Sequence, residues 1–326
     1  MGAADSATAL QIAVDLAAIR AAHARIRPHV HRTPVLTSRS LDAAAGATLF
    51  FKCENLQKIG AFKARGACNA VFSLDEAEAS RGVVTHSSGN HGAALAWAAA
   101  RRGIPAWVVM PENSAQIKKA AVQGLGATVR FCAPTLEARD TTCAAVQAET
   151  GALLIHPYDD WRVIAGQGTA ALELLEQVPD LDTVITPVGG GGLLSGTAIA
   201  SRGIDPSIRV YGAEPAGADD AWQSLQSGRI VPQTDPRTIA DGLRSSLGVK
   251  TFAVLSTLVE SIGTTSEEAI VRAMRLTWDK LKLVIEPSAA VPLAALLERK
   301  LPVAGGRVGI VISGGNVDLD RLPWQR

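Results

Sequence analysis

The segment TVITPVGGGGLLS, residues 183–195, decides the fold of this chain. Its β-branched run 183–188 predicts a buried strand, and the apolar stretch after the glycines predicts a helix. Four successive residues without side chains let backbone N–H groups converge on a phosphate, assisted by the start of the helix. No lysine follows the glycines as in a P-loop, and Leu194 and Ser195 stand where a dinucleotide motif would have its last glycine. We therefore predict a strand, a loop and a helix that bind a compact monophosphate.

Similar β-rich runs alternate with Ala-rich helical stretches on both sides of this segment. The runs are 48–52, 82–85, 106–109, 128–131, 183–188, 208–213 and 307–312. Alternation of this kind predicts an α/β fold with parallel sheets covered by helices. The runs form two clusters, so we predict two open parallel-sheet domains with a cleft between them as the natural ligand site. The large domain comprises 1–80 and 159–326, and the small domain comprises 81–158.

The composition favours a folded enzyme that acts on small molecules. The chain has 326 residues, of which 47% are hydrophobic, and this is enough for a sizeable core. Lys and Arg number 32 against 31 Asp and Glu, so a net charge of +1 gives no broad field for nucleic acid or an anionic membrane. We see no membrane-spanning run and no signal-peptide pattern. The four cysteines form no CxxC pair, which favours a reduced, cytoplasmic compartment.

The segment GAFKARG, residues 60–66, places Lys63 just inside a helix that follows a glycine. The helix macrodipole disfavours an ammonium at this end, so the lysine is a candidate for an amine of lowered pKa or for an imine. A lone lysine at such a place is usually an ordinary surface residue. The other motifs of the chain decide between the two interpretations.

Two further segments end a strand with small polar residues. In 83–92 a strand runs into Ser87–His91 and then into an Ala-rich helix, where amides and hydroxyls suit a carboxylate and Asn90 could donate to a ring oxygen. An ordinary helix cap is the alternative, and His91 is better explained as structural. In 309–316 a buried strand delivers the hydroxyl of Ser313 to the edge where open parallel sheets bind ligands, although a serine before two glycines also suits a simple turn.

In this order and across most of the chain, these four segments resemble the fold-type II pyridoxal-phosphate enzymes, and among them the serine/threonine dehydratase (ammonia-lyase) and serine racemase family. The resemblance implies a tryptophan-synthase-beta-like fold with pyridoxal 5'-phosphate in the cleft between the domains. It makes Lys63 the catalytic residue that binds the cofactor as a Schiff base. The implied cofactor-binding residues are Phe62, Lys63, Asn90, Gly189, Gly190, Gly191, Gly192, Leu193 and Ser313. The implied substrate-binding residues are Ser87, Ser88, Gly89, Asn90 and His91.

A fifth segment, residues 210–220, resembles the metal loop of serine racemase. The resemblance implies that Glu214, Asp220 and the carbonyl of Ala218 bind a divalent cation, Mg or Ca, through hard oxygen ligands. An acidic surface loop is the alternative interpretation.

The resemblance implies a dehydratase that converts a 3-hydroxy amino acid to a 2-keto acid and ammonia, in a homodimer. Threonine, serine, hydroxyaspartate and phenylserine are all candidate substrates. A neutral Ser313 leaves the pyridine nitrogen largely unprotonated, which β-elimination tolerates. Ser88 stands where serine racemases have their second catalytic base, so a racemase with side dehydratase activity remains the alternative, while 156–160 is more similar to the dehydratases. Lys63 and the glycine loop argue against a non-enzymatic binding module.

Overall fold

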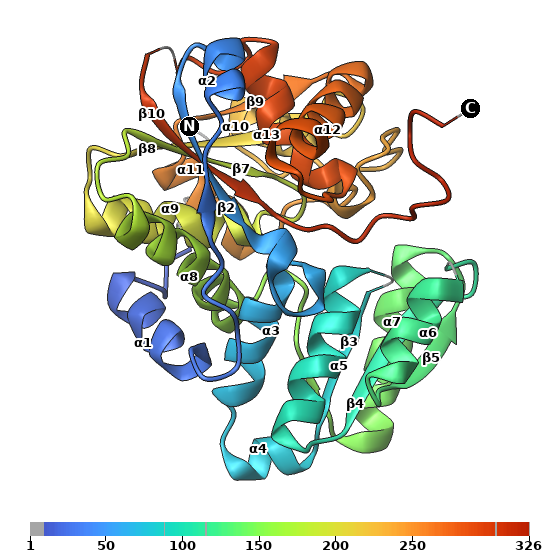
Figure 1. Ribbon diagram of the computed structural model, residues 1–326. Helices are drawn as coiled ribbons and strands as arrows, with labels where there is room; N and C mark the ends of the chain where they lie inside the picture. The colour runs from blue at the N-terminus through green and yellow to red at the C-terminus, as the bar shows by residue number, and fades with distance from the viewer. Residues whose placement is uncertain (1–9, 88, 115, 304, 326) are drawn as a thin grey trace, which may run out of the picture.

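The computed structural model describes residues 10–87, 89–114, 116–303 and 305–325, folded around two separate β-sheets (Figure 1). The larger sheet has the strand order β1-β2-β10-β7-β8-β9, in which β1 at the edge is antiparallel to β2 and the other described pairs are parallel. Its strands are β1 (Val35–Leu36), β2 (Thr48–Cys53), β7 (Thr183–Pro187), β8 (Arg209–Pro215), β9 (Ser261–Thr265) and β10 (Arg307–Ile312).

The smaller sheet has the strand order β5-β4-β3-β6, and its described strands all run parallel. Its strands are β3 (Val83–His86), β4 (Ala106–Pro111), β5 (Thr128–Cys132) and β6 (Leu153–Leu154). The predicted α/β class and the runs taken for strands are thus confirmed, with ends that differ by one or two residues. The predicted domain limits, the homodimer and the cytoplasmic location stay predictions.

Helices cover both faces of the larger sheet, so its central strands β7 and β10 are buried along almost their whole length. Neighbouring residues of β7 such as Val184 and Ile185 point to opposite faces and join different apolar clusters. One face packs on α2 (Arg39–Ala45), α12 (Glu267–Leu281) and α13 (Pro287–Leu297). The other face packs on α1 (Leu16–Ile26), α8 (Trp161–Gln177), α9 (Gly192–Ile204) and α11 (Val249–Leu258).

The smaller sheet is likewise covered on two sides, and Figure 1 shows it beside the C-terminal ends of the larger one. The helices around it are α3 (Lys63–Phe72), α4 (Glu76–Ser80), α5 (Asn90–Arg102), α6 (Gln116–Gly124) and α7 (Leu136–Thr150). The remaining helical segments are α10 (Asp220–Ser227), η1 (Glu54–Leu56), η2 (Lys58–Gly60) and η3 (Asp241–Leu243). All four cysteines are free and buried. Within the described residues, no helix is both long and apolar enough to cross a membrane.

Each sheet and the helices that cover it form one half of the molecule. Helix α3 joins the two halves because it packs on both α5 and α8. It approaches α8 so closely that a β-carbon on Gly166 would lie 2.6 Å from the Cα atom of Gly66. Beside this contact, the buried guanidinium of Arg65 donates to the carboxylates of Glu54 (2.7 Å) and Glu173 (2.8 Å). Such buried ion pairs add little net stability, but they strongly disfavour any arrangement that leaves one charge unpaired. The first turn of α3 is therefore held in one position.

Candidate active site

Lys63 is the first residue of α3, the helix that packs on both α5 and α8. The strand end at Ser313 positions it, because the Phe62 amide donates to the Ser313 carbonyl at 3.0 Å. The ammonium nitrogen Nζ donates to the carbonyl of Pro157 at 2.8 Å. Burial of the amine lowers the pKa of Lys63 to about 8, and the nearby Glu286 carboxylate opposes this shift. About a tenth of the amine is therefore in the neutral form at pH 7, the form that attacks an aldehyde, compared with less than about a thousandth for an ordinary lysine.

The glycine loop joins β7 to α9 and packs too tightly for side chains. Gly191 adopts a left-handed conformation with φ of 86°, which glycine adopts without steric cost. A β-carbon on Gly189 would lie 2.9 Å from the carbonyl oxygen of Gly242, and one on Gly190 would collide with the ring of Tyr158. No side chain caps the first turn of α9, so its amide groups are free to bind an anion. The loop therefore fits a phosphate group.

Ser313 and Asn90 are each connected to the surroundings of Lys63, Ser313 through the Phe62 amide and Asn90 through the Glu286 carboxylate that acts on the lysine. Ser313 follows β10 and is almost fully buried. Asn90 opens α5, donates to the Glu286 carboxylate at 3.0 Å and accepts from the Asn316 amide at 2.9 Å. These hydrogen bonds fix the orientation of the Asn90 amide at the junction of the two halves.

The remaining predicted substrate-binding residues lie in the turn between β3 and α5. The amide of Gly89 donates to the Ser87 hydroxyl oxygen at 3.2 Å. His91 is buried, with Nε2 3.3 Å from the carbonyl of Ile155, and burial together with the charge of Lys63 holds its pKa well below the usual value. His91 therefore stays neutral. Ser88, the predicted second catalytic residue, lies outside the described residues.

Three residues at the site were not predicted as site residues, although each contacts one that was. Glu286 and Asn316 hold Asn90, and Tyr158 covers the glycine loop. Glu286 precedes Pro287 at the start of α13, a position that reads as an ordinary helix start. Its burial next to a lysine amine depends on the tertiary fold, so no local pattern reveals it.

The predicted cation loop lies at the C-terminal end of β8. Glu214 and Asp220 are both buried, and burial raises the pKa of Glu214 well above its usual value and that of Asp220 to about 6. Glu214 accepts hydrogen bonds from the backbone of α10, whereas Oδ2 of Asp220 has no partner in the described part of the chain. No group of three or more His, Cys, Asp or Glu side chains suited to a metal gathers among the described residues, so the site offers two carboxylates and the buried Ala218 carbonyl.

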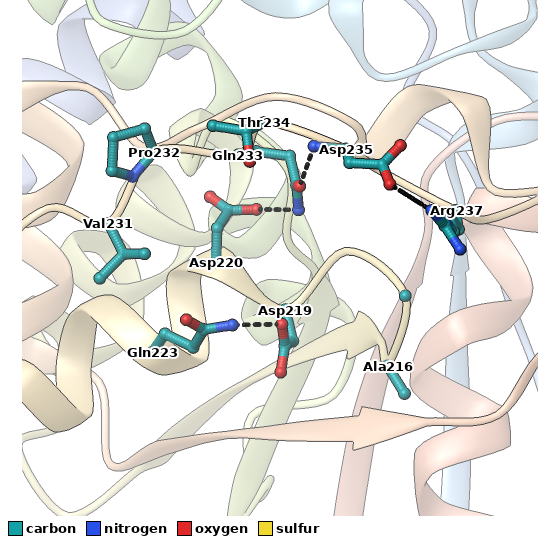
Figure 2. Close-up of a pocket in the computed structure, with 11 residues that line it drawn as sticks. Ala216, Asp219, Asp220, Gln223, Val231, Pro232, Gln233, Thr234, Asp235 and Arg237 are labelled. Atoms are coloured by element: carbon teal, nitrogen blue, oxygen red, sulfur yellow. Dashed lines mark hydrogen bonds and ion pairs between the residues drawn. The ribbon is translucent and has the colours of Figure 1, made fainter.

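Asp220 also lines a surface cavity of about 430 Å³ beside this loop, which Figure 2 shows. There one oxygen of Asp220 accepts from Gln233 at 3.2 Å, while Asp219 accepts from Gln223 at 2.7 Å. Two desolvated carboxylates, one with an unpaired oxygen, suit a hard divalent cation. The residues therefore fit the group that the resemblance implies.

Comparison with known proteins identifies the family. A family model described as pyridoxal-phosphate dependent enzyme matches residues 26–314. A beta-hydroxyaspartate dehydratase of Paracoccus denitrificans (strain Pd 1222) is 53% identical over 304 residues, which cover 93% of this chain and 96% of the relative. A serine racemase of Dictyostelium discoideum is 51% identical over 313 residues, with 95% and 97% covered. The solved structure of maize serine racemase superposes with a TM-score of 0.93 at 51% identity, with 94% of this chain and 95% of that chain covered.

The chain belongs to the pyridoxal-phosphate dependent enzyme family, which confirms the resemblance drawn from its motifs. The site fits the cofactor on its own evidence: a glycine loop with uncapped amides faces the same junction as a lysine amine of lowered pKa. Relatives named as dehydratase and as racemase are similarly close, so the comparisons establish a dehydratase or racemase type of enzyme and leave the reaction open.

We predict that the lowered pKa of Lys63 governs how fast the cofactor attaches. In apo-protein mixed with pyridoxal 5'-phosphate, the rate of imine formation should rise with pH and level off above about 8, because the neutral amine is then the main form. Absorbance in the violet follows this reaction. Replacing Glu286 by Gln removes a charge that raises the pKa, so Glu286→Gln should shift the profile to lower pH.

The controls are two lysine variants and a free amine. Lys63→Ala should retain its circular dichroism spectrum but lose the violet absorbance, whereas Lys58→Ala should keep both. N-acetyl-lysine should show a rate that rises until about pH 10. A protein profile that matches this free amine would show that Lys63 is not perturbed.

Proposed function

We propose that this enzyme is a dehydratase (ammonia-lyase) that converts a 3-hydroxy amino acid to a 2-keto acid and ammonia. The observation that carries the proposal is the Lys63 amine, held against the Pro157 carbonyl with its pKa lowered to about 8. An amine of this kind can bind the cofactor and, once substrate has displaced it, accept a proton near neutral pH. Lys63 is therefore a single group that can both bind the cofactor and act as the base of the reaction.

The bound cofactor supplies an electron sink for the electron pair left when the substrate α-C–H bond breaks. Lys63 takes that proton, and its ammonium form can then return a proton to the departing hydroxide. The turn that holds Ser87 and Gly89 binds the substrate carboxylate through amide and hydroxyl groups at the start of α5. A neutral Ser313 avoids strengthening the electron sink, which favours elimination over reactions that need a protonated ring nitrogen.

Arg139 favours a substrate with a second carboxylate, such as 3-hydroxyaspartate. Its side chain is half-buried, and its Nε atom has no hydrogen-bond partner among the described residues. Burial lowers the pKa of His86; the Asp140 carboxylate, 3.6 Å from Nε2, opposes this shift, and the Arg139 guanidinium adds to it. The His86 ring in turn packs edge-on against His156, whose pKa senses the charge of Lys63. The incompletely bonded Arg139 guanidinium is thus linked to Lys63 through the rings of His86 and His156. A second support is that the dehydratase relative acts by name on hydroxyaspartate.

We predict that Arg139 decides substrate preference. Arg139→Ala should lower kcat/KM for 3-hydroxyaspartate by roughly 10- to 100-fold, because a charge-assisted hydrogen bond contributes about 1.5–3 kcal/mol. The values for serine and threonine should change less than about threefold, since neither has a second carboxylate. Keto acid and ammonia are measured for each substrate, with 3-phenylserine included in the panel.

Arg130→Ala is the matched control, because Arg130 is also half-buried with an unpartnered Nε atom, but its Nη2 atom is paired with the Glu149 carboxylate at 2.7 Å. It should leave all substrates unaffected. Equal losses on serine and hydroxyaspartate in Arg139→Ala would remove the second-carboxylate assignment. No keto acid from any member of the panel with wild-type enzyme would refute the dehydratase.

Serine racemase activity is the second candidate, because relatives named as racemases align over nearly the whole chain. Racemisation needs a proton donor on the face of the substrate opposite Lys63, and we propose Ser88 for that function. We predict that Ser88→Ala keeps at least half of the L-substrate dehydratase activity and loses any racemisation. Chiral chromatography and keto-acid assays measure the two reactions separately. Wild-type racemisation faster than keto-acid release would make the racemase the main activity.

We also propose that Glu214, Asp220 and the Ala218 carbonyl bind Mg or Ca. Two buried carboxylates with raised pKa values are poorly stabilised as anions, and a divalent cation would neutralise both. Because the ligands come from β8 and from the start of α10, the cation would tie this helix to the larger sheet.

We predict that the cation raises thermal stability. At a concentration 100 times its dissociation constant it should add about 2.7 kcal/mol, which corresponds to a rise in Tm of roughly 5 °C over chelator-treated protein. Asp220→Asn should abolish the response, whereas Asp219→Asn, at a half-exposed neighbouring carboxylate, should retain it. Identical melting curves with Mg, with Ca and with chelator would exclude the site.

A further inference from the structure

Residues 156–159 connect the lysine to the phosphate loop, and we propose that Asp159 in this segment is a positioning residue for the cofactor. The segment leads from β6 of the smaller sheet to α8. The proposal rests on the proposed cofactor site and adds a residue whose carboxylate bonds the backbone of the neighbouring helix α11. Asp159 sets the position of the phosphate loop relative to Lys63.

The first contact of the segment is with the lysine. The carbonyl of Pro157 accepts from Nζ of Lys63 at 2.8 Å. Pro157 is buried, so the packing around it limits the movement of this carbonyl. The position of the amine is therefore tied to that of residues 156–159.

The second contact is with the glycine loop, directly through the ring of Tyr158. A β-carbon on Gly190 would collide with this ring, and one on Gly192 would lie 3.0 Å from the Tyr158 β-carbon. Van der Waals contact on this side sets how closely the loop can approach, but it does not hold the loop from the other side.

Asp159 supplies the contact from the other side through α11. Its Oδ1 atom accepts from the backbone amides of Lys250 (2.8 Å) and Thr251 (3.2 Å) in the first turn of that helix. The same turn packs on the loop, because a β-carbon on Gly191 would lie 2.8 Å from the Thr251 β-carbon and 2.9 Å from Cδ2 of Leu247. The carboxylate thus fixes the helix that encloses the phosphate loop.

The backbone and the carboxylate of Asp159 are both held by close contacts. Its own amide donates to Nδ1 of His156 at 2.9 Å, and burial lowers the pKa of this histidine to about 4, so the ring stays a neutral acceptor at physiological pH. A β-carbon on Gly248, at the start of α11, would collide with the Asp159 carboxylate. A side chain one methylene longer than Asp would push α11 away from the segment.

This arrangement matters because the cofactor has two attachment points on one rigid ring. Its aldehyde carbon must reach Lys63 while its phosphate occupies the glycine loop. A displacement of a fraction of an ångström between the two weakens one of these contacts. The alternative is that Asp159 only caps α11, which stabilises a protein without affecting one ligand more than another.

Asp160 provides a control, since it is the next residue and also caps a helix. Its Oδ1 atom accepts from the Arg162 amide at 2.8 Å at the start of α8, and its Oδ2 atom pairs with the Arg162 guanidinium at 2.6 Å. In the described part of the chain, no hydrogen bond joins its side chain to α11. The variants to compare are Asp159→Ala, Asp159→Asn, Asp159→Glu and Asp160→Ala.

The experiment measures the dissociation constants of pyridoxal 5'-phosphate and of pyridoxal from apo-protein, with apo-protein melting curves in parallel. We expect Asp159→Ala to weaken pyridoxal 5'-phosphate about tenfold and pyridoxal less than twofold, because pyridoxal has no phosphate to place. Asp159→Glu should behave like Asp159→Ala, and Asp159→Asn, whose amide oxygen still accepts, should stay within about threefold of wild type. Asp160→Ala should lower Tm as much as Asp159→Ala without weakening either ligand.

Equal binding of pyridoxal 5'-phosphate by wild type, Asp159→Ala and Asp159→Glu would overturn the proposal and leave Asp159 as a helix cap. Equal weakening of pyridoxal and pyridoxal 5'-phosphate would also overturn it, because the phosphate loop would not be the part affected. If Asp159→Ala does not fold, the comparison of Asp159→Glu with Asp159→Asn gives the same decision. Failure of wild-type protein to bind pyridoxal 5'-phosphate would refute the cofactor site itself.

Discussion

The hydrogen bond from Lys63 to the Pro157 carbonyl joins the start of α3 to the segment that leads from β6 to α8, and the rest of the site is arranged around it. A buried amine is costly to charge, so burial lowers the pKa of Lys63 to about 8, and the Glu286 carboxylate limits that shift. Without the carboxylate the amine would be a weaker proton acceptor; without burial almost none of it would be in the neutral form at neutral pH. Burial lowers the pKa and the Glu286 charge raises it, and this balance suits an amine that must first attack an aldehyde and later accept a proton.

An amine balanced in this way needs a rigid support, and the fold supplies one from buried charge. Arg65, two residues along α3 from Lys63, is fully buried between the carboxylates of Glu54 and Glu173, and Lys52 donates to Glu173 at 2.7 Å. A core of apolar side chains would be at least as stable. The ion pairs are directional, however, so they fix the rotation of α3 about its axis as well as its depth. That rotation decides where the Lys63 side chain points.

The parts of the site that were predictable from the sequence are those whose chemistry is local. Gly189–Gly192 and Lys63 stand out because a phosphate loop and a helix-start lysine need particular residues next to one another in the chain. Glu286 was not predictable, because its effect on Lys63 depends on a contact between segments more than 200 residues apart in the sequence. Strand β9 (Ser261–Thr265) was missed for a related reason: it is an edge strand with a weak apolar pattern, and its pairing with β8 defines it.

Elimination and racemisation begin with the same removal of the α-proton, so the scaffold that positions Lys63 and the phosphate serves both. The reactions diverge afterwards, at groups on the opposite face of the substrate and around its side chain. Such groups are few, and exchanging one of them leaves the packing of two sheets and their helices intact. We propose that Arg139 is of this kind, because its side chain is half-buried and its Nε atom has no hydrogen-bond partner among the described residues. A guanidinium in this state gains a hydrogen bond when a substrate carboxylate reaches it, so exchanging it would change the preferred substrate while the scaffold around Lys63 stays the same.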